Sequence, residues 1–312
     1  MGIFDRWRRG PQPPPRGGHQ GSVLPALDQQ AADRLMAMAR ADLAGRGHEA
    51  TINAGFLELA GGQVYGLHNL SVLVSQERER HWPALVARHF DRMLVERDRD
   101  APPDPGKVLV KLRMREDMPN QPEYEPLEPV PGVVALVAID EPTVVVESLA
   151  LPEGIPDIPT ALRLARANLV ELPAPEHVTR LLDEDDPSSR VHLFITEDFF
   201  GASRLLVLDR LLTSVGVTPG PGGLLVALPS RHVLAVHPMS GPGVVSAMNW
   251  LVRFAEEDSA TAPGPISPHV YHLAHDGRTS RVTRPGESGG HAVMVEGAFQ
   301  EAFLRVIGDD ED

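Results

Sequence analysis

Apolar positions recur with two different periods along this chain, and each period predicts one kind of element. Where they recur every three or four residues, one face of a helix packs on a core. This period predicts a helix that follows Asp28 as its N-cap and ends near Gly45. A second helix is predicted to carry Pro83 in its first turn. Further helices are predicted in four later segments: 158–173, 205–215, 243–257 and 295–303.

Elsewhere the apolar residues alternate with polar ones or run together, which is typical of strands that lie in a covered sheet. Two early segments, 50–59 and 63–75, are predicted as paired strands, with Gly61 and Gly62 in the turn between them. The remaining strands are predicted in 108–114, 132–139, 143–148 and 190–196, in a hairpin over 224–238, and in a late hairpin that turns at Asp276 and Gly277.

These elements do not follow a regular alternation of strand and helix, so the pattern favours an α+β fold with mixed or antiparallel sheets and helices packed on them. The charged, proline-rich segment 97–107 is predicted as a linker between an N-terminal subdomain, 23–96, and a C-terminal domain, 108–308. A basic, proline-rich tail, 1–22, is expected to be disordered, and an acidic tail, 309–312, follows the last domain.

Composition narrows the range of functions. The 312 residues include 43 acidic and 29 basic ones, and the resulting net charge of −14 repels the phosphate backbone of nucleic acids. The chain has no cysteine, so neither disulfides nor thiolate metal sites are available. No apolar run approaches the ~20 residues of a membrane span, and the N-terminus lacks the pattern of a secretory signal. We therefore expect a cytoplasmic protein with no nucleic-acid partner and no stable membrane association.

Three stretches carry a resemblance to a known family: VVALVAIDEPTVVVESL leading to ALRLARANL, then GASRLLVLDRLL, and LLVALPSRHVLAV. With a weaker likeness in VYGLHNLSVLV, they resemble the YtpQ-like family of uncharacterised bacterial proteins over about residues 50–237. That family tends to have an acidic residue after the Ser-Arg pair of the hairpin, where this chain has His232. The role of that acid therefore does not transfer, and the resemblance implies a fold and no activity.

A polar insert interrupts the hairpin 224–238 and gives the first candidate site. Pro229 to Arg231 are expected to reverse the chain, which places Arg231 near solvent. An arginine fork and an imidazole at a strand end can hold a carboxylate or a phosphate, although the plain alternative is a solvated turn. We expect a hairpin turn that, if it has a function, contributes to binding through Ser230, Arg231 and His232 and does no chemistry.

A second group of candidates lies on the segment 63–75. Tyr65, His68 and Asn69 could line a cleft; alternatively, the two polar residues satisfy buried backbone groups or face water.

The function expected from these residues is that of a non-catalytic binding or interaction module for a protein or a small anionic ligand, without a cofactor. The alternative is a hydrolase in which Ser230 and His232 act with a carboxylate, Asp140 or Asp198. A deep pocket with a strongly raised pKa on one of these carboxyls would favour the enzyme.

Three histidines stand at intervals of three, at positions 269, 272 and 275. On an extended strand the outer two face one way and His272 faces the other, so they cannot hold one ion together. No metal site is expected there.

Overall fold

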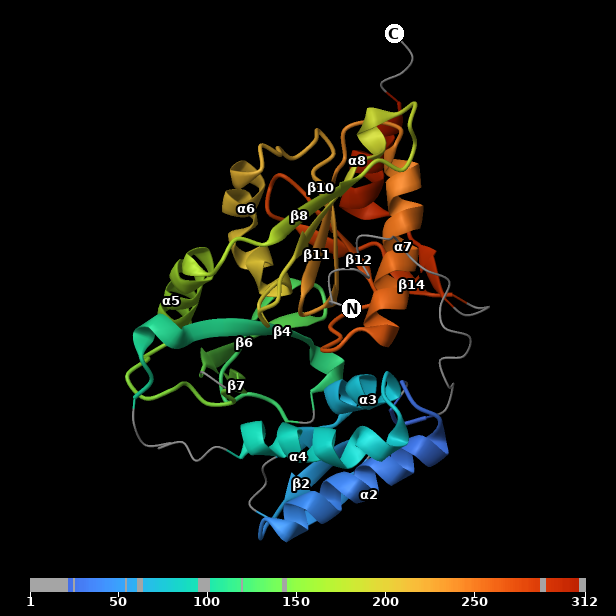
Figure 1. The fold of residues 1–312 in the computed structure, drawn as a ribbon. Helices are drawn as coiled ribbons and strands as arrows, with labels where there is room; N and C mark the ends of the chain where they lie inside the picture. The colour runs from blue at the N-terminus through green and yellow to red at the C-terminus, as the bar shows by residue number, and fades with distance from the viewer. Residues whose placement is uncertain are drawn as a thin grey trace.

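The structure is a computed structural model, and it describes residues 22–24, 26–53, 55–60, 64–94, 102–118, 120–141, 145–286 and 290–308. Four predicted features lie wholly or partly outside the described residues: the acidic tail, residues 1–21 of the basic tail, residues 97–101 of the linker, and the turn at Gly61 and Gly62. Helices and antiparallel sheets confirm the α+β fold class. Figure 1 shows the N-terminal helices at one end of the molecule and the largest sheet, with α7 (Val244–Thr261) beside it, at the other.

The N-terminal unit packs three helices on a small antiparallel sheet around a core of its own. The predicted first helix is confirmed, and its cap forms because the backbone N–H of Ala31 donates to Oδ1 of Asp28 at 2.7 Å. The helix with Pro83 in its first turn is also confirmed, and it buries Trp82, Val86 and Phe90. The elements of this unit are α2 (Gln29–Gly45), β1 (Ala50–Asn53), β2 (Phe56–Leu59), β3 (Val64–Gly66), α3 (His68–Ser75) and α4 (Trp82–Met93).

The prediction of one long strand over 63–75 was wrong, because only β3 is extended and α3 follows it. Leu67, Leu70 and Val74 are buried at spacings of three and four, which is the period of a helix and not of a strand. The segment 50–59 is likewise not one strand but the hairpin of β1 and β2, with Gly55 in the left-handed region at φ +81°.

A second antiparallel sheet has the order β4-β6-β5, and β7 also pairs with β6. Its central strand is buried along nearly its whole length, as its apolar sequence predicts. Helix α5 packs on β4 and starts at the N-cap Asp157, whose side chain accepts from the backbone N–H of Thr160 at 2.8 Å. The elements here are β4 (Val108–Met114), β5 (Leu127–Val130), β6 (Val133–Asp140), β7 (Val145–Glu147) and α5 (Ile158–Glu171).

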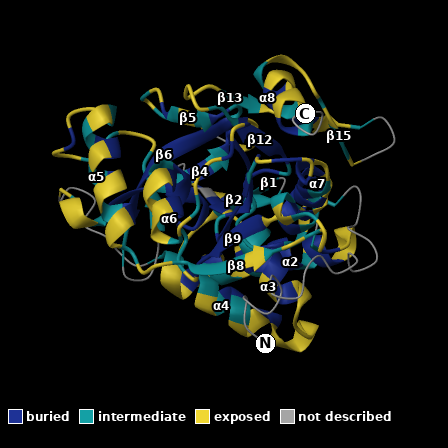
Figure 2. Cartoon of the chain, turned by 90° about the horizontal axis from the view of Figure 1, so that it is seen from above, coloured by how far each residue is buried: buried dark blue, intermediate teal, exposed yellow. Residues whose placement is uncertain are grey.

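The largest sheet has six strands in the order β13-β12-β10-β11-β9-β8. One face shares a core with the second sheet, α5 and α6, and the other face is covered by α7 and α8. In Figure 2 the inner strands of this sheet, such as β9 and β12, are largely dark blue and the edge strand β8 is teal. The helices around them have yellow outer faces, as expected for a core on both sides. The elements are β8 (Glu176–Arg180), β9 (Val191–Ile195), α6 (Leu208–Ser214), β10 (Leu224–Ser230), β11 (Val233–Pro238), α7 (Val244–Thr261), β12 (Val270–Leu273), β13 (Thr279–Arg281) and α8 (Gly297–Ile307), with a separate hairpin of β14 (Thr283–Pro285) and β15 (His291–Val293).

The prediction of the late hairpin is confirmed, and the prediction of the last helix is wrong at its start. The turn at Asp276 and Gly277 is confirmed, since Leu273 pairs with Thr279 across it. The last helix starts only at Gly297, so Val295 lies before it and is 43% exposed, contrary to its predicted place on the apolar face.

The hairpin over 224–238 is confirmed, but its turn lies elsewhere than expected. Ser230 still belongs to β10 and pairs with Val233, so Arg231 and His232 make the reversal. The strand extends this far because the chain before β12 pairs with its outer edge: the N–H of Ile266 donates to the carbonyl of Pro229 at 2.9 Å. None of the helices in the described ranges combines the length and the apolar character that crossing a membrane requires.

Candidate functional site

Arg231 lies at the tip of the β10–β11 hairpin, and its surroundings correct the expectation that it would be near solvent. The guanidinium is half-buried, and its Cζ atom lies 4.2 Å from the centre of the Phe199 ring. Its Nε donates to Nε2 of His232 at 2.9 Å. Burial, followed by the charge of Arg113, lowers the pKa of Arg231 to about 10. The side chain is thus a partly desolvated cation held flat on an aromatic ring.

His232 is held as a neutral ring that positions Arg231. Its Nδ1 lies 3.2 Å from the carbonyl oxygen of Thr196, so Nδ1 donates there while Nε2 accepts from Arg231. Burial, followed by the charge of Arg231, lowers the pKa of His232 to about 4. Both ring nitrogens are therefore occupied, and the imidazole is neutral at physiological pH.

Ser230 faces away from this ring. Its hydroxyl donates to Oδ2 of Asp258 on α7 at 2.7 Å, with both side chains buried. Since each nitrogen of His232 has another partner, the structure does not assemble the serine–histidine pair that a hydrolase would use here.

The carboxylates considered for that enzyme also have other surroundings. Asp198 forms an ion pair of 2.9 Å with the buried Arg204. Burial, followed by the charge of Asp198, raises the pKa of Asp140. No hydrogen bond within the described ranges joins either carboxylate to the ring of His232.

Opposite the tip lie three charged residues that the sequence reasoning did not select: Lys111 and Arg113 on β4, and Glu147 on β7. They flank β6 from its two sides, and because directly opposed residues in antiparallel strands share a face, they all project from one face of the sheet. Their partners on β6 are, respectively, Leu136, Val134 and Ala138. The signal for the two cations was present, since the alternation in VLVKLRM places both on one side of a strand.

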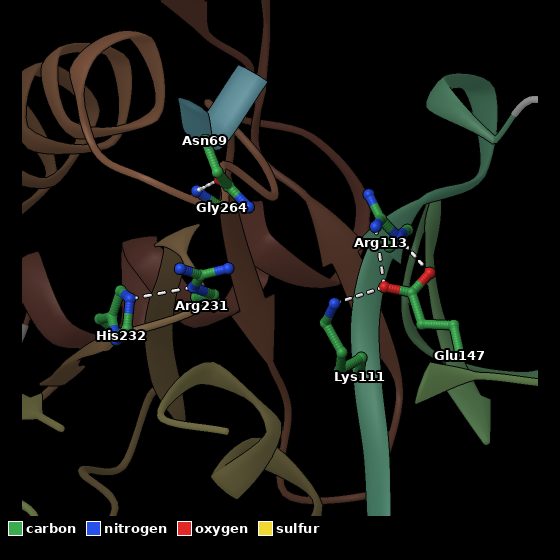
Figure 3. A network of polar contacts seen from close by, with 7 residues as sticks. All are labelled: Asn69, Lys111, Arg113, Glu147, Arg231, His232 and Gly264. Atoms are coloured by element: carbon green, nitrogen blue, oxygen red, sulfur yellow. Dashed lines mark hydrogen bonds and ion pairs between the residues drawn. The ribbon is translucent and has the colours of Figure 1, made fainter. Parts of the chain in front are cut away.

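Glu147 binds both cations of β4. Nε and Nη2 of Arg113 each donate to its carboxylate at 2.7 Å, and Nζ of Lys111 donates to the same group. Burial opposes ionisation of Glu147, but the charges and hydrogen bonds of Lys111 and Arg113 outweigh it and lower its pKa to about 2. Figure 3 shows Arg231 between His232 on one side and this group on the other. We call Lys111, Arg113, Arg231 and Glu147 the basic cluster.

Of the early candidates, Asn69 reaches the tip. Its Oδ1 accepts from the N–H of Gly264 at 2.5 Å, and the carbonyl of Gly264 accepts from the N–H of Arg231 at 2.8 Å (Figure 3). Two hydrogen bonds thus connect α3 of the N-terminal unit to the hairpin. Asn69 supports the loop beside the guanidinium.

The other two early candidates lie apart from the tip. Tyr65 belongs to the N-terminal core, edge-on to Phe90 with ring centres 5.9 Å apart. His68 lies in α3, and burial lowers its pKa. No described interaction joins either side chain to the basic cluster.

Gly264 gives a first test of how tightly the tip is packed. It has φ +69°, and a Cβ atom there would lie 2.5 Å from Cδ of Arg231. Backbone strain alone costs about 1–2 kcal/mol, and we expect Gly264→Ala to lower the free energy of unfolding by more than this, because of the added contact with Arg231. Gly277→Ala is the matched control in urea denaturation, because Gly277 has φ +83° with open space around it. Equal losses for the two variants would show that the contact with Arg231 adds nothing.

The three late histidines each have a partner of their own. Nδ1 of His269 lies 3.1 Å from the hydroxyl of Thr283, and Nε2 of His272 and of His275 lie 2.8 Å from the carbonyls of Gly222 and Gly220. In the part of the chain that the structure describes, no group of three or more metal-ligating side chains is arranged to hold an ion.

Comparisons with models of protein families, with curated proteins and with solved structures find no match to this chain. The resemblance to the YtpQ-like family stays a prediction.

Proposed function

We propose that this protein is a non-catalytic binding module that holds a small anionic ligand at the basic cluster. The observation that supports this most is the state of Arg231. Its two terminal nitrogens have no acceptor among the described residues, although the side chain is half-buried. The charge of Glu147 acts on Arg231 only from a distance, without an ion pair. A partly desolvated cation without an ion-pair partner costs free energy, and a bound anion would offset that cost.

Two further features support binding of an anion without catalysis: the orientation of the guanidinium and the state of His232. The guanidinium is oriented by Phe199 and by His232, so its free edge is fixed before any ligand arrives. Arginine binds carboxylates and phosphates through two parallel hydrogen bonds, and such a fork works best when it is held in place. The neighbouring histidine has no free nitrogen with which to move a proton.

The proposal is tested by ligand-dependent thermal stability. Low concentrations of phosphate, sulfate and citrate, compared with chloride at equal ionic strength, should raise the melting temperature of the wild-type protein. A ligand present at 100 times its dissociation constant stabilises the folded state by about 2.7 kcal/mol. Arg231→Met should lose this increase, yet fold with a stability within about 1 kcal/mol of the wild type, because methionine keeps the apolar contact with Phe199.

Arg278→Met is the matched control. Its side chain is 66% exposed and contacts Asp276 in a surface ion pair, so it should respond to anions as the wild type does. General salt effects act on all three proteins alike. An increase that persists in Arg231→Met would contradict the proposal.

A further inference from the structure

The charges of the basic cluster do not balance. Lys111, Arg113 and Arg231 carry three positive charges, and Glu147 supplies one negative charge, which the two cations of β4 share. Asp117 faces Arg113, but no ion pair joins the two side chains in the described ranges, so two positive charges remain without an ion-pair partner. A singly charged ligand would neutralise only one of the two, whereas a dianion neutralises both.

The two excess charges are also close together. Arg113 is near enough to lower the pKa of Arg231, and Arg231 in turn lowers that of Lys111, although burial is the larger cause for both. Lys111 and Arg113 stand two positions apart on one face of β4. A ligand that carries both negative charges on one centre fits this spacing better than one whose charges sit on separate groups.

The unoccupied hydrogen-bond donors also favour a dianion with several acceptor oxygens. Glu147 occupies Nε and Nη2 of Arg113, which leaves Nη1 of Arg113 and the two terminal nitrogens of Arg231 without acceptors in the described ranges. These donors come from strand β4 and from the turn between β10 and β11, on opposite sides of the site (Figure 3). A planar carboxylate satisfies one guanidinium fork, while a phosphate group offers three strong acceptor oxygens in a tetrahedral arrangement.

We infer that the basic cluster selects a compact tetrahedral dianion, of the class of phosphate monoesters, over singly charged carboxylates and phosphate diesters. This inference rests on the proposed function, because it specifies the anion that the same site binds.

The pKa values around the site make this inference testable by pH. Burial lowers the pKa of His232 to about 4, so the ring stays neutral from about pH 5 upward. Glu147, with a pKa of about 2, and Arg231, with one of about 10, keep their charges from about pH 5 to about pH 8. Two neighbours have perturbed pKa values of their own: burial lowers that of Lys111 and raises that of Asp117, which faces Arg113. A phosphate monoester loses its second proton near pH 6, within this range.

The experiment is isothermal titration calorimetry of the full chain at constant ionic strength, with methyl phosphate, dimethyl phosphate, acetate and sulfate as probes. At about pH 8, methyl phosphate and sulfate should bind at least tenfold more tightly than dimethyl phosphate and acetate. Between about pH 8 and pH 5 the affinity for methyl phosphate should fall about tenfold, because only about a tenth of it remains dianionic. Sulfate stays dianionic throughout, so its affinity should change less than twofold. A fall for sulfate as large as that for methyl phosphate would assign the pH dependence to Lys111 or Asp117 and contradict selection by the charge of the ligand.

Arg231→Met distinguishes a failure of dianion selection from a failure of anion binding at the basic cluster. If all four probes bind equally well to the wild type and are all lost in this variant, anion binding stands and selection of a dianion is refuted. If no probe binds in a manner that depends on Arg231, the proposed function itself fails. Tight binding of methyl phosphate and sulfate alone, lost in Arg231→Met and retained in Arg278→Met, supports both.

Discussion

Glu147→Gln is expected to lower the free energy of unfolding at neutral pH by about 3 kcal/mol. The substitution removes the carboxylate that pairs with both Lys111 and Arg113. Removing one partner of a buried ion pair costs about 3–5 kcal/mol. Solvent reduces the loss, because the side chain of Arg113 is 43% exposed, although that of Glu147 is only 20% exposed. The lowering of the pKa of Glu147 from 4.5 to about 2 corresponds to a similar free energy, about 3 kcal/mol.

The pH dependence of the loss identifies its cause. Because the pKa of Glu147 is lower in the folded than in the unfolded protein, its contribution is fully present above about pH 4.5 and is lost as the pH falls toward about 2. Urea denaturation of wild type and Glu147→Gln should therefore give curves that approach each other as the solution is acidified. Glu125→Gln is the control, since Glu125 is 85% exposed and pairs with Arg115 at the surface. A Glu147 variant as stable as this control at neutral pH would mean that the cluster needs no carboxylate.

Leu234→Ala is the second large effect, with an expected loss of about 2–5 kcal/mol in urea denaturation. Leu234 on β11 is fully buried and is paired with Phe194 on the neighbouring strand β9. It belongs to the core shared by the two larger sheets. Truncation would leave a cavity that the strands on either side cannot close.

Leu304→Ala on α8 removes the same atoms from a side chain that is 54% exposed. Its expected loss is below about 0.5 kcal/mol, as for ordinary surface positions. Comparable losses for the two leucines would show that the face of β11 toward the second sheet is not tightly packed.

The elements that the sequence predicted well are those with one strong period. The helix with Trp82, Val86, Phe90 and Met93 places its apolar residues at i, i+4, i+8 and i+11, over three turns. A strand would turn Met93 to the face opposite the other three, so only a helix packs all four on one core. The helix α3 was missed because it is short and follows a strand directly. In VYGLHNLSVLVS the apolar residues fit either period over a few positions, and contacts with α4 decide for the helix.

The candidate site was predictable only in part. The polar insert of the hairpin predicted Arg231 as a candidate. Its neighbours are Phe199, Arg113, Glu147 and Gly264, which lie far apart in the sequence, and no local pattern connects them. The alternation of β4 shows Lys111 and Arg113 on one face. Their partnership with Glu147 depends on β6 lying between β4 and β7, which is a property of the sheet order and not of the local sequence.

The strand order of the largest sheet also bears on self-association. A sheet edge exposes backbone groups that can pair with another molecule, and natural proteins block such pairing with short or charged edge strands. At one edge β13 has three residues, and at the other β8 carries Glu176, His177 and Arg180 among its five. The apolar strands β9 to β12, which would aggregate most readily, are thus enclosed between two edges that discourage growth of the sheet from one molecule into the next.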